Sequence, residues 1–106
     1  MMMNDHVQYL SVQEVIAIHN AALEKFGGSA GVRDEGLLNS SCAQPAQSFD
    51  GYELYPTLAE NAAQYAYGII NNHPFVDGNK RTGAAVLGTF LRLNGCRFKP
   101  RAHVFL

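Results

Sequence analysis

One short stretch, residues 73–82, constrains the fold more than any other, because it joins two segments that both carry helical periodicity. It reads His-Pro-Phe-Val-Asp-Gly-Asn-Lys-Arg-Thr. Pro74 disfavours helical backbone at the preceding residue, so the upstream helix should end at His73 or just before it. From Gly78 onward a new helix can begin, and its first N–H groups have no partner within the helix. Those donors, the helix dipole and the following lysine and arginine predict a binding site for phosphate.

The segments on both sides of this stretch are predicted to be helices. Residues 57–60 have the spacing of a capping box, and apolar residues then recur at steps of three and four as far as Asn72 or His73. His73 continues that apolar face, so it should face the interior or a cleft in it. The downstream helix should run from about Gly78 to Asn94. It is apolar nearly all round, which predicts the central helix of the fold.

Another helix is predicted near the N-terminus. Ser11 begins a second capping box, apolar residues recur as far as Phe26, and a Gly-Gly pair should end the helix. His19 lies on the apolar face, where a hydrogen-bonded core residue is more common than a ligand. The glycine-rich residues 27–31 lack the spacing of a phosphate-binding loop and follow a helix instead of a strand, so we expect an ordinary loop there.

A short helix and a hairpin should separate these two helical regions. Asp34 should cap the short helix, which ends before Pro45. Residues 47–55 then place aromatic side chains on both sides of an Asp-Gly pair, which favours a tight hairpin turn. The residues expected in this hairpin are Phe49, Asp50, Gly51 and Tyr52.

The size predicts one domain over residues 1–106, and the predicted helices make it all-α with one small hairpin. The chain is 47% hydrophobic and 16% charged, as is ordinary for a globular protein, and its net charge of −1 argues against a general nucleic-acid binder. The sequence shows neither a signal peptide nor an apolar run of membrane-spanning length, so we expect a cytoplasmic protein. Cys42 and Cys96 should then be free and mostly buried thiols.

The residues of the 73–82 stretch suit phosphoryl or nucleotidyl transfer to a hydroxyl group. His73 can act as the base that takes the hydroxyl proton, because its ordinary pKa lies near neutrality. Asp77 can hold Mg²⁺ through one oxygen, with waters and phosphates completing the coordination. The remaining side chains, Asn79, Lys80 and Arg81, can hold the phosphates together with the helix N–H groups.

Each of these residues also has a plain structural explanation. In this explanation His73 does no more than cap the end of a helix, and Asp77 does no more than cap the start of the next one. Asn79 could be a turn residue, and the two cations could be solvated. These explanations would all have to coincide, in order and at this spacing, so the shared site is the preferred interpretation. Phe75 is the exception, and we expect it to anchor the loop in the core.

The stretch resembles the signature of the Fic/Doc family, which is a histidine, any residue, Phe, any residue, an acid, Gly or Ala, Asn, Gly or Lys, and Arg. Every position is filled, by His73, Phe75, Asp77, Gly78, Asn79, Lys80 and Arg81. Lysine in the Gly-or-Lys position resembles the death-on-curing, or Doc, branch. Residues 32–38 are also similar to an early segment of that branch.

The resemblance implies a Fic-like helical bundle and a toxin of a type II toxin–antitoxin system. In this family the hydroxyl acceptor of the Doc branch is elongation factor Tu, and the donor is ATP with Mg²⁺. The implied site residues are His73, Asp77 and Arg81 for catalysis, Asp77 for the metal, and Gly78, Asn79, Lys80 and Arg81 for the nucleotide. The hairpin would be the family's flap, which docks the target beside the active site.

The resemblance also implies partners. The inhibitor would be an antitoxin whose disordered tail folds along the toxin. Members of the family usually have one more helix after the point where this chain stops, and that C-terminal helix is apparently missing here. The central helix would then expose apolar surface, so we expect antitoxin binding or a homodimer at that surface.

Two alternative functions remain. Other branches of the family transfer AMP, with glycine at position 80 and a second arginine at position 84. This chain has Lys80 and Ala84, which favour phosphate transfer, but Gly78 stands where the Doc branch has alanine. The second alternative is a catalytically silent module that only binds the antitoxin.

Overall fold

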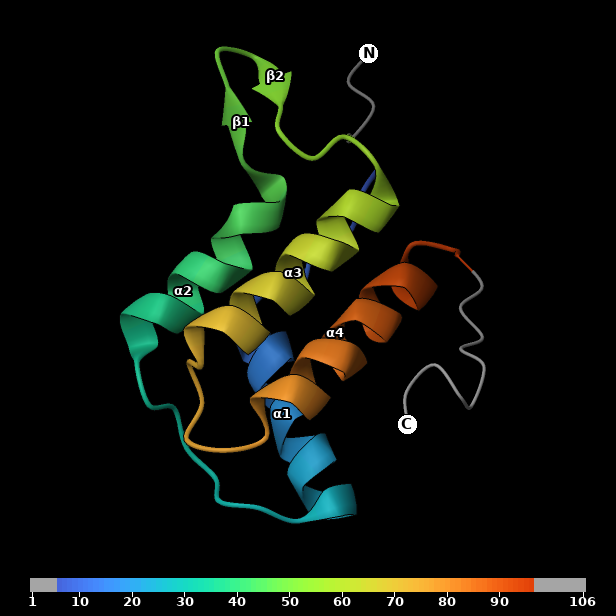
Figure 1. The fold of residues 1–106 in the computed structure, drawn as a ribbon. Helices are drawn as coiled ribbons and strands as arrows, with labels where there is room; N and C mark the ends of the chain where they lie inside the picture. Colours follow the sequence, from blue (N-terminus) through green and yellow to red (C-terminus); the bar gives the residue numbers. More distant parts are fainter. Residues whose placement is uncertain (1–5, 97–106) are drawn as a thin grey trace.

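The computed structural model describes residues 6–96, which form four α-helices and one small hairpin (Figure 1). The elements are α1 (Val12–Phe26), α2 (Glu35–Ala43), a 3-10 helix (Gln44–Ala46), β1 (Ser48–Phe49), β2 (Tyr52–Glu53), α3 (Leu58–Asn72) and α4 (Asn79–Leu93). The prediction of an all-α fold with one hairpin is therefore confirmed. The expected loss of a C-terminal helix concerns the chain after residue 96 and lies outside the described residues.

The helices begin where the capping residues predict. Ser11 caps α1, and its capping box is complete because Glu14 also accepts a hydrogen bond from the Ser11 backbone N–H. At α3 the Thr57 side chain accepts from the Glu60 N–H, but the Glu60 carboxylate accepts from the Thr57 hydroxyl instead of its backbone. Asp34 caps α2 through the Leu37 N–H.

Helix α3 occupies the middle of the fold. It packs against α2 and the 3-10 helix on one side and against α4 on the other, while α1 packs against α4 and α2 (Figure 1). Two glycines permit the close approach: a Cβ atom at Gly83 would lie 2.7 Å from Ile70 Cγ1, and one at Gly68 would lie 3.2 Å from the Ser41 Cα atom. The prediction that α4 is central is wrong, because its charged side chains keep one face of the helix exposed.

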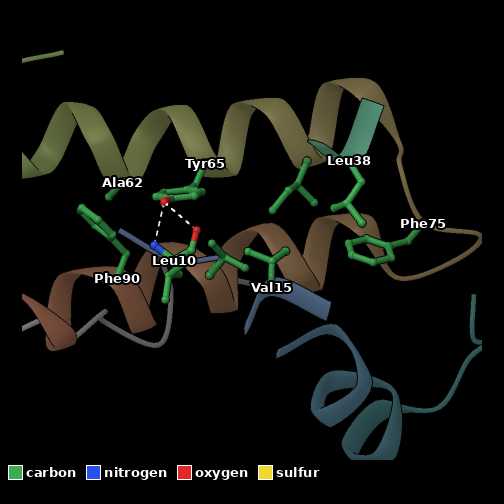
Figure 2. Packing of buried hydrophobic residues seen from close by; sticks show 9 residues of the cluster. Leu10, Val15, Leu38, Ala62, Tyr65, Phe75 and Phe90 are labelled. Carbon is green, nitrogen blue, oxygen red and sulfur yellow. Dashed lines mark hydrogen bonds between the residues drawn. The ribbon is translucent and has the colours of Figure 1, made fainter. Parts of the chain in front are cut away.

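The core lies between α3, α4 and α1 (Figure 2). It comprises Leu10, Val15, Leu38, Ala62, Tyr65, Ile69, Phe75, Val86 and Phe90. Tyr65 is fully buried, and its hydroxyl is bonded to the backbone of Leu10. This bond fixes the segment that leads into α1 against α3.

The two cysteines are free thiols, as predicted, but both are half-buried. Burial raises the pKa of the Cys42 thiol to about 11, so this side chain stays protonated near neutral pH. Within residues 6–96, none of the helices has the combination of length and apolar character needed to cross a membrane.

The predicted hairpin is present. Ser48 pairs with Glu53 and Phe49 with Tyr52, and the turn residues Asp50 and Gly51 have φ values of 53° and 83°. Two positive φ values are the mark of a type I′ turn, which matches the twist of the strands. As a flap, the hairpin was expected beside the active site. It lies instead where α3 begins, whereas the His73 loop lies where α3 ends (Figure 1). The 15 residues of α3 separate them by about 22 Å.

We expect Tyr65→Phe to lower the free energy of unfolding by about 1–3 kcal/mol, because it leaves the Leu10 N–H buried without its partner. In the native protein that N–H lies 2.8 Å from the Tyr65 hydroxyl, which itself donates to the Leu10 carbonyl at 3.2 Å. Urea denaturation measures the change. Tyr52→Phe is the matched control, since Tyr52 is 76% exposed. Equal stability of the two variants would contradict the role of this bond.

Candidate active site

The residues that the sequence assigns to catalysis, metal and nucleotide all line one pocket of about 550 Å³, whereas Phe75 and the hairpin residues do not. It is formed by the end of α1, the loop after α3 and the first turn of α4. The lining residues are Phe26, Gly27, Gly28, His73, Val76, Asp77, Gly78, Asn79, Lys80 and Arg81. An imidazole, a carboxylate and two cations therefore face a single cavity.

His73 ends α3 in a left-handed conformation, with φ 49° and ψ 55°. A non-glycine residue in this region stores strain, and here the surrounding contacts hold it. Arg33 supplies them: its Nε donates to the His73 carbonyl at 2.6 Å and its Nη2 to the Asn72 carbonyl at 2.8 Å. Because the arginine caps these carbonyls, the imidazole is not needed as a helix cap. The ring is exposed at the pocket wall, so the interior position that we considered is wrong and the cleft position holds.

The loop is held in shape by Phe75 and Asn79. The Phe75 backbone N–H donates to Asn79 Oδ1 and its carbonyl accepts from Asn79 Nδ2, both at 3.0 Å. The Phe75 ring is buried and stacks on the His19 ring at 3.8 Å. Both polar groups of the Asn79 side chain are thus engaged. We expected this side chain to bind phosphate, but in the structure its oxygen and one of its N–H groups hold the loop.

His19 is the hydrogen-bonded core residue that was expected, and its partner belongs to the site. Its ring is 1% exposed, and its Nε2 donates to the Asp77 carbonyl oxygen at 2.8 Å. The same ring therefore supports the loop twice, through stacking on Phe75 and through this hydrogen bond. Sequence reasoning found the burial of His19 but not its contact with the loop, which joins residues 58 positions apart.

The Asp77 carboxylate is positioned by two backbone donors. Oδ2 accepts from the Ser29 N–H at 3.1 Å and Oδ1 from the Gly78 N–H at 2.8 Å. These bonds, followed by the nearby Arg81 charge, lower the pKa of the Asp77 carboxyl below its ordinary value, so the group is ionised near neutral pH. No side chain caps α4, so the interpretation of Asp77 as only a helix cap is not what the geometry shows.

The positive charge of the pocket comes from Lys80 and Arg81, which are exposed on the first turn of α4. The Arg81 guanidinium lies 4.7 Å from the centre of the Phe26 ring, and its Nη1 donates to the Phe26 carbonyl at 3.3 Å. The end of α1 thereby holds the arginine at the pocket edge. Gly78 precedes the helix with a φ of 74°, a conformation that glycine adopts without strain.

Residues 28–34 bind the loop along its length, and Gly28 also lines the pocket. Pro74 accepts hydrogen bonds from the N–H groups of Arg33 and Asp34, at 2.7 and 3.1 Å, and the Val76 N–H donates to the Gly31 carbonyl at 3.0 Å. Gly28 must be small, because a Cβ atom there would lie 2.9 Å from Asp77 Oδ2. Residues 27–31 were expected to be an ordinary loop. The only signal of a further role was the resemblance in residues 32–38.

Comparisons with known proteins match most of this chain. The family model described as Fic/DOC matches residues 9–91. The chain is 41% identical over 88 residues to the Toxin Doc of Mycolicibacterium smegmatis, a match that covers 83% of this chain and 65% of that protein. It is 34% identical over 89 residues to the Protein kinase doc of Escherichia phage P1, covering 84% of this chain and 70% of that protein. The chain thus spans slightly less than two thirds of the Mycolicibacterium protein.

We expect Asn79→Ala to lower the free energy of unfolding by about 1–3 kcal/mol, because the buried backbone groups of Phe75 lose their partners. The matched control is Asn71→Ala, since Asn71 is exposed on α3. Thermal or urea denaturation compares the two variants. A stable Asn79→Ala protein that had lost only nucleotide affinity would contradict the structural role. It would show that the Asn79 side chain binds the nucleotide.

Proposed function

Because this chain belongs to the Fic/Doc family, we propose that it is a Doc-type toxin that transfers the γ-phosphate of ATP to a protein hydroxyl group. One observation carries the proposal: the imidazole of His73, the carboxylate of Asp77, the guanidinium of Arg81 and an uncapped helix N-terminus face the same pocket. The printed names of the two relatives, a toxin and a protein kinase, support the same assignment.

The donor set fits a magnesium nucleotide. Asp77 keeps oxygen lone pairs beyond the two that Ser29 and Gly78 occupy, and a carboxylate is a preferred ligand of Mg²⁺. Among the described residues there is no cluster of three or more His, Cys, Asp or Glu side chains that could hold a metal alone. Phosphate oxygens and waters would complete the coordination, as is common for Mg²⁺, which neutralises charge on the phosphates when it is bound.

The residues divide the chemical work. His73 takes the proton of the acceptor hydroxyl as its oxygen forms the new bond to the γ-phosphorus. The bond between that phosphorus and the β–γ bridging oxygen breaks, and ADP leaves. Arg81, Lys80 and the first N–H groups of α4 bind the phosphate oxygens, where charge accumulates in the transition state. Such positioning and charge stabilisation account for most of the catalysis in phosphoryl transfer.

Phosphate is preferred over AMP because of positions 80 and 84. The long side chain of Lys80 lines the pocket at the start of α4, where glycine would leave bare backbone. Ala84 is exposed on the same helix and offers no second cation for the far end of a triphosphate. AMP transfer is the alternative, supported by Gly78 in place of alanine. The pose of the nucleotide decides which phosphorus the acceptor attacks.

The biological setting follows from the same proposal. The acceptor would be elongation factor Tu in the cytoplasm, and its modification would stop translation. The inhibitor would be an antitoxin whose disordered tail folds on this protein. Antitoxin binding or a homodimer would cover apolar surface on α4, where Leu93 is 41% exposed.

We expect Arg81→Ala to weaken Mg²⁺–ATP binding by about 1.5–3 kcal/mol, the usual contribution of hydrogen bonds to a charged group. Titration calorimetry measures this change, and circular dichroism should show an intact fold because Arg81 is exposed. Arg92→Ala is the control, since it removes the same charge from the last turn of α4, outside the pocket. Equal affinities of the two variants would show that Arg81 does not bind the nucleotide.

Intact-mass spectrometry of elongation factor Tu, incubated with the protein, Mg²⁺ and ATP, tests the reaction itself. We expect a phosphoryl adduct and label from γ-labelled ATP only. His73→Ala should reduce the rate by about 10²–10⁴, the usual effect of losing a general base. Label from α-labelled ATP alone would establish AMP transfer instead. Full activity of a folded His73→Ala protein would exclude His73 as the base.

A further inference from the structure

His73 separates two hollows. It lines the anion pocket described above and also a second hollow of about 310 Å³, whose other lining residues are Tyr67, Ile70 and Asn71. Among residues 6–96, His73 alone lines both. The second hollow lies along α3, whereas the anion pocket lies between the ends of α1 and α4.

A transfer reaction needs separate binding places for the donor nucleotide and for the acceptor hydroxyl group. In phosphoryl transfer the attacking and leaving oxygens lie roughly in line on opposite sides of the phosphorus. The base must also be within hydrogen-bond reach of the attacking hydroxyl. Because His73 lines both hollows, an acceptor in the second hollow can bring its hydroxyl group to the imidazole while a nucleotide occupies the anion pocket.

The second hollow continues along α3. A third hollow of about 280 Å³ shares Tyr67 with it and extends between α2 and α3 past Ser40, Gln44 and Tyr55. Tyr55 lies two residues after the end of β2, so the path leads from near the hairpin to His73. Tyr67 lies at the junction of the two hollows and is 63% exposed, so its ring is accessible to a binding partner.

The two sides differ in charge. Asp77, Lys80 and Arg81 line the anion pocket, but none of the Asp, Glu, Lys or Arg residues within 6–96 lines the second or third hollow. The path offers aromatic rings, one aliphatic side chain and uncharged hydroxyl and amide groups. It therefore suits an uncharged peptide and provides no cations for a nucleic-acid backbone.

We propose that Tyr67 and the two hollows beside it form the docking surface for the acceptor, an extended and uncharged protein segment whose hydroxyl residue lies at His73. This inference rests on the proposed transferase function. An apolar residue of the segment packs against Tyr67 and Ile70, and small polar residues follow along the third hollow. At about 3.3 Å per residue, roughly seven extended residues cover the length of α3 and reach the hairpin.

Tyr67→Ala tests the docking surface in the transfer assay with elongation factor Tu as the probe. We expect KM for elongation factor Tu to rise about tenfold or more, because exposed tyrosines at interfaces are often dominant contacts. The affinity for Mg²⁺–ATP should be unchanged, since Tyr67 does not line the anion pocket. Tyr67→Phe should restore most of the affinity. Leu93→Ala is the control, an exposed apolar side chain on α4 that lines neither hollow.

A second measurement separates docking from chemistry. Binding of elongation factor Tu is measured with the His73→Ala protein, with and without Tyr67→Ala, by titration calorimetry. Weaker binding of the double variant supports the docking surface even if the wild type transfers no phosphate, an outcome that would refute only the proposed function. Equal binding or an unchanged KM overturns the inference. A loss confined to antitoxin affinity also overturns it and assigns the surface to the antitoxin.

Discussion

The site depends on the burial of one aromatic ring in the loop between two helices. Phe75 is buried against His19, and both of its backbone polar groups are bonded to the Asn79 side chain. A buried backbone group without a partner is costly, so this pair of bonds makes one loop conformation much more stable than the others. His73 and Asp77, two residues away on either side, are thereby fixed relative to α4.

The strain at His73 has the same origin. The chain must leave α3, place Pro74 and return to α4 within six residues, and His73 accommodates the turn with a positive φ. Arg33 and residues 28–34 supply the hydrogen bonds that hold this conformation. Strained backbone at a functional side chain is common, because the surrounding contacts then define its position closely. Here they leave the imidazole free while its backbone is held.

The electrostatics of the molecule follow from this geometry. The net charge is only −1, but the cations and the carboxylate of the site are gathered at the junction of α1 and α4. Backbone donors lower the pKa of the exposed Asp77 carboxyl. Among the described residues, no Asp, Glu, Lys or Arg lines the two hollows along α3. His73 therefore lines both the charged anion pocket, which suits a nucleotide, and an uncharged hollow, which suits a peptide.

The sequence by itself determined the helices, the hairpin turn and the grouping of the site residues, because each depends on neighbours within a few positions. Caps at Ser11, Asp34 and Thr57, the Asp-Gly turn and the proline after His73 are all local signals. Only the tertiary structure decided the role of Asn79, the contact of His19 with Asp77, the capping by Arg33 and the distance of the hairpin from His73. The hydrogen bonds from His19, Ser29 and Arg33 to this loop join residues 58, 48 and 40 positions apart. Such contacts arise only when helices pack, and packing depends on the shapes of whole faces, which no local pattern specifies.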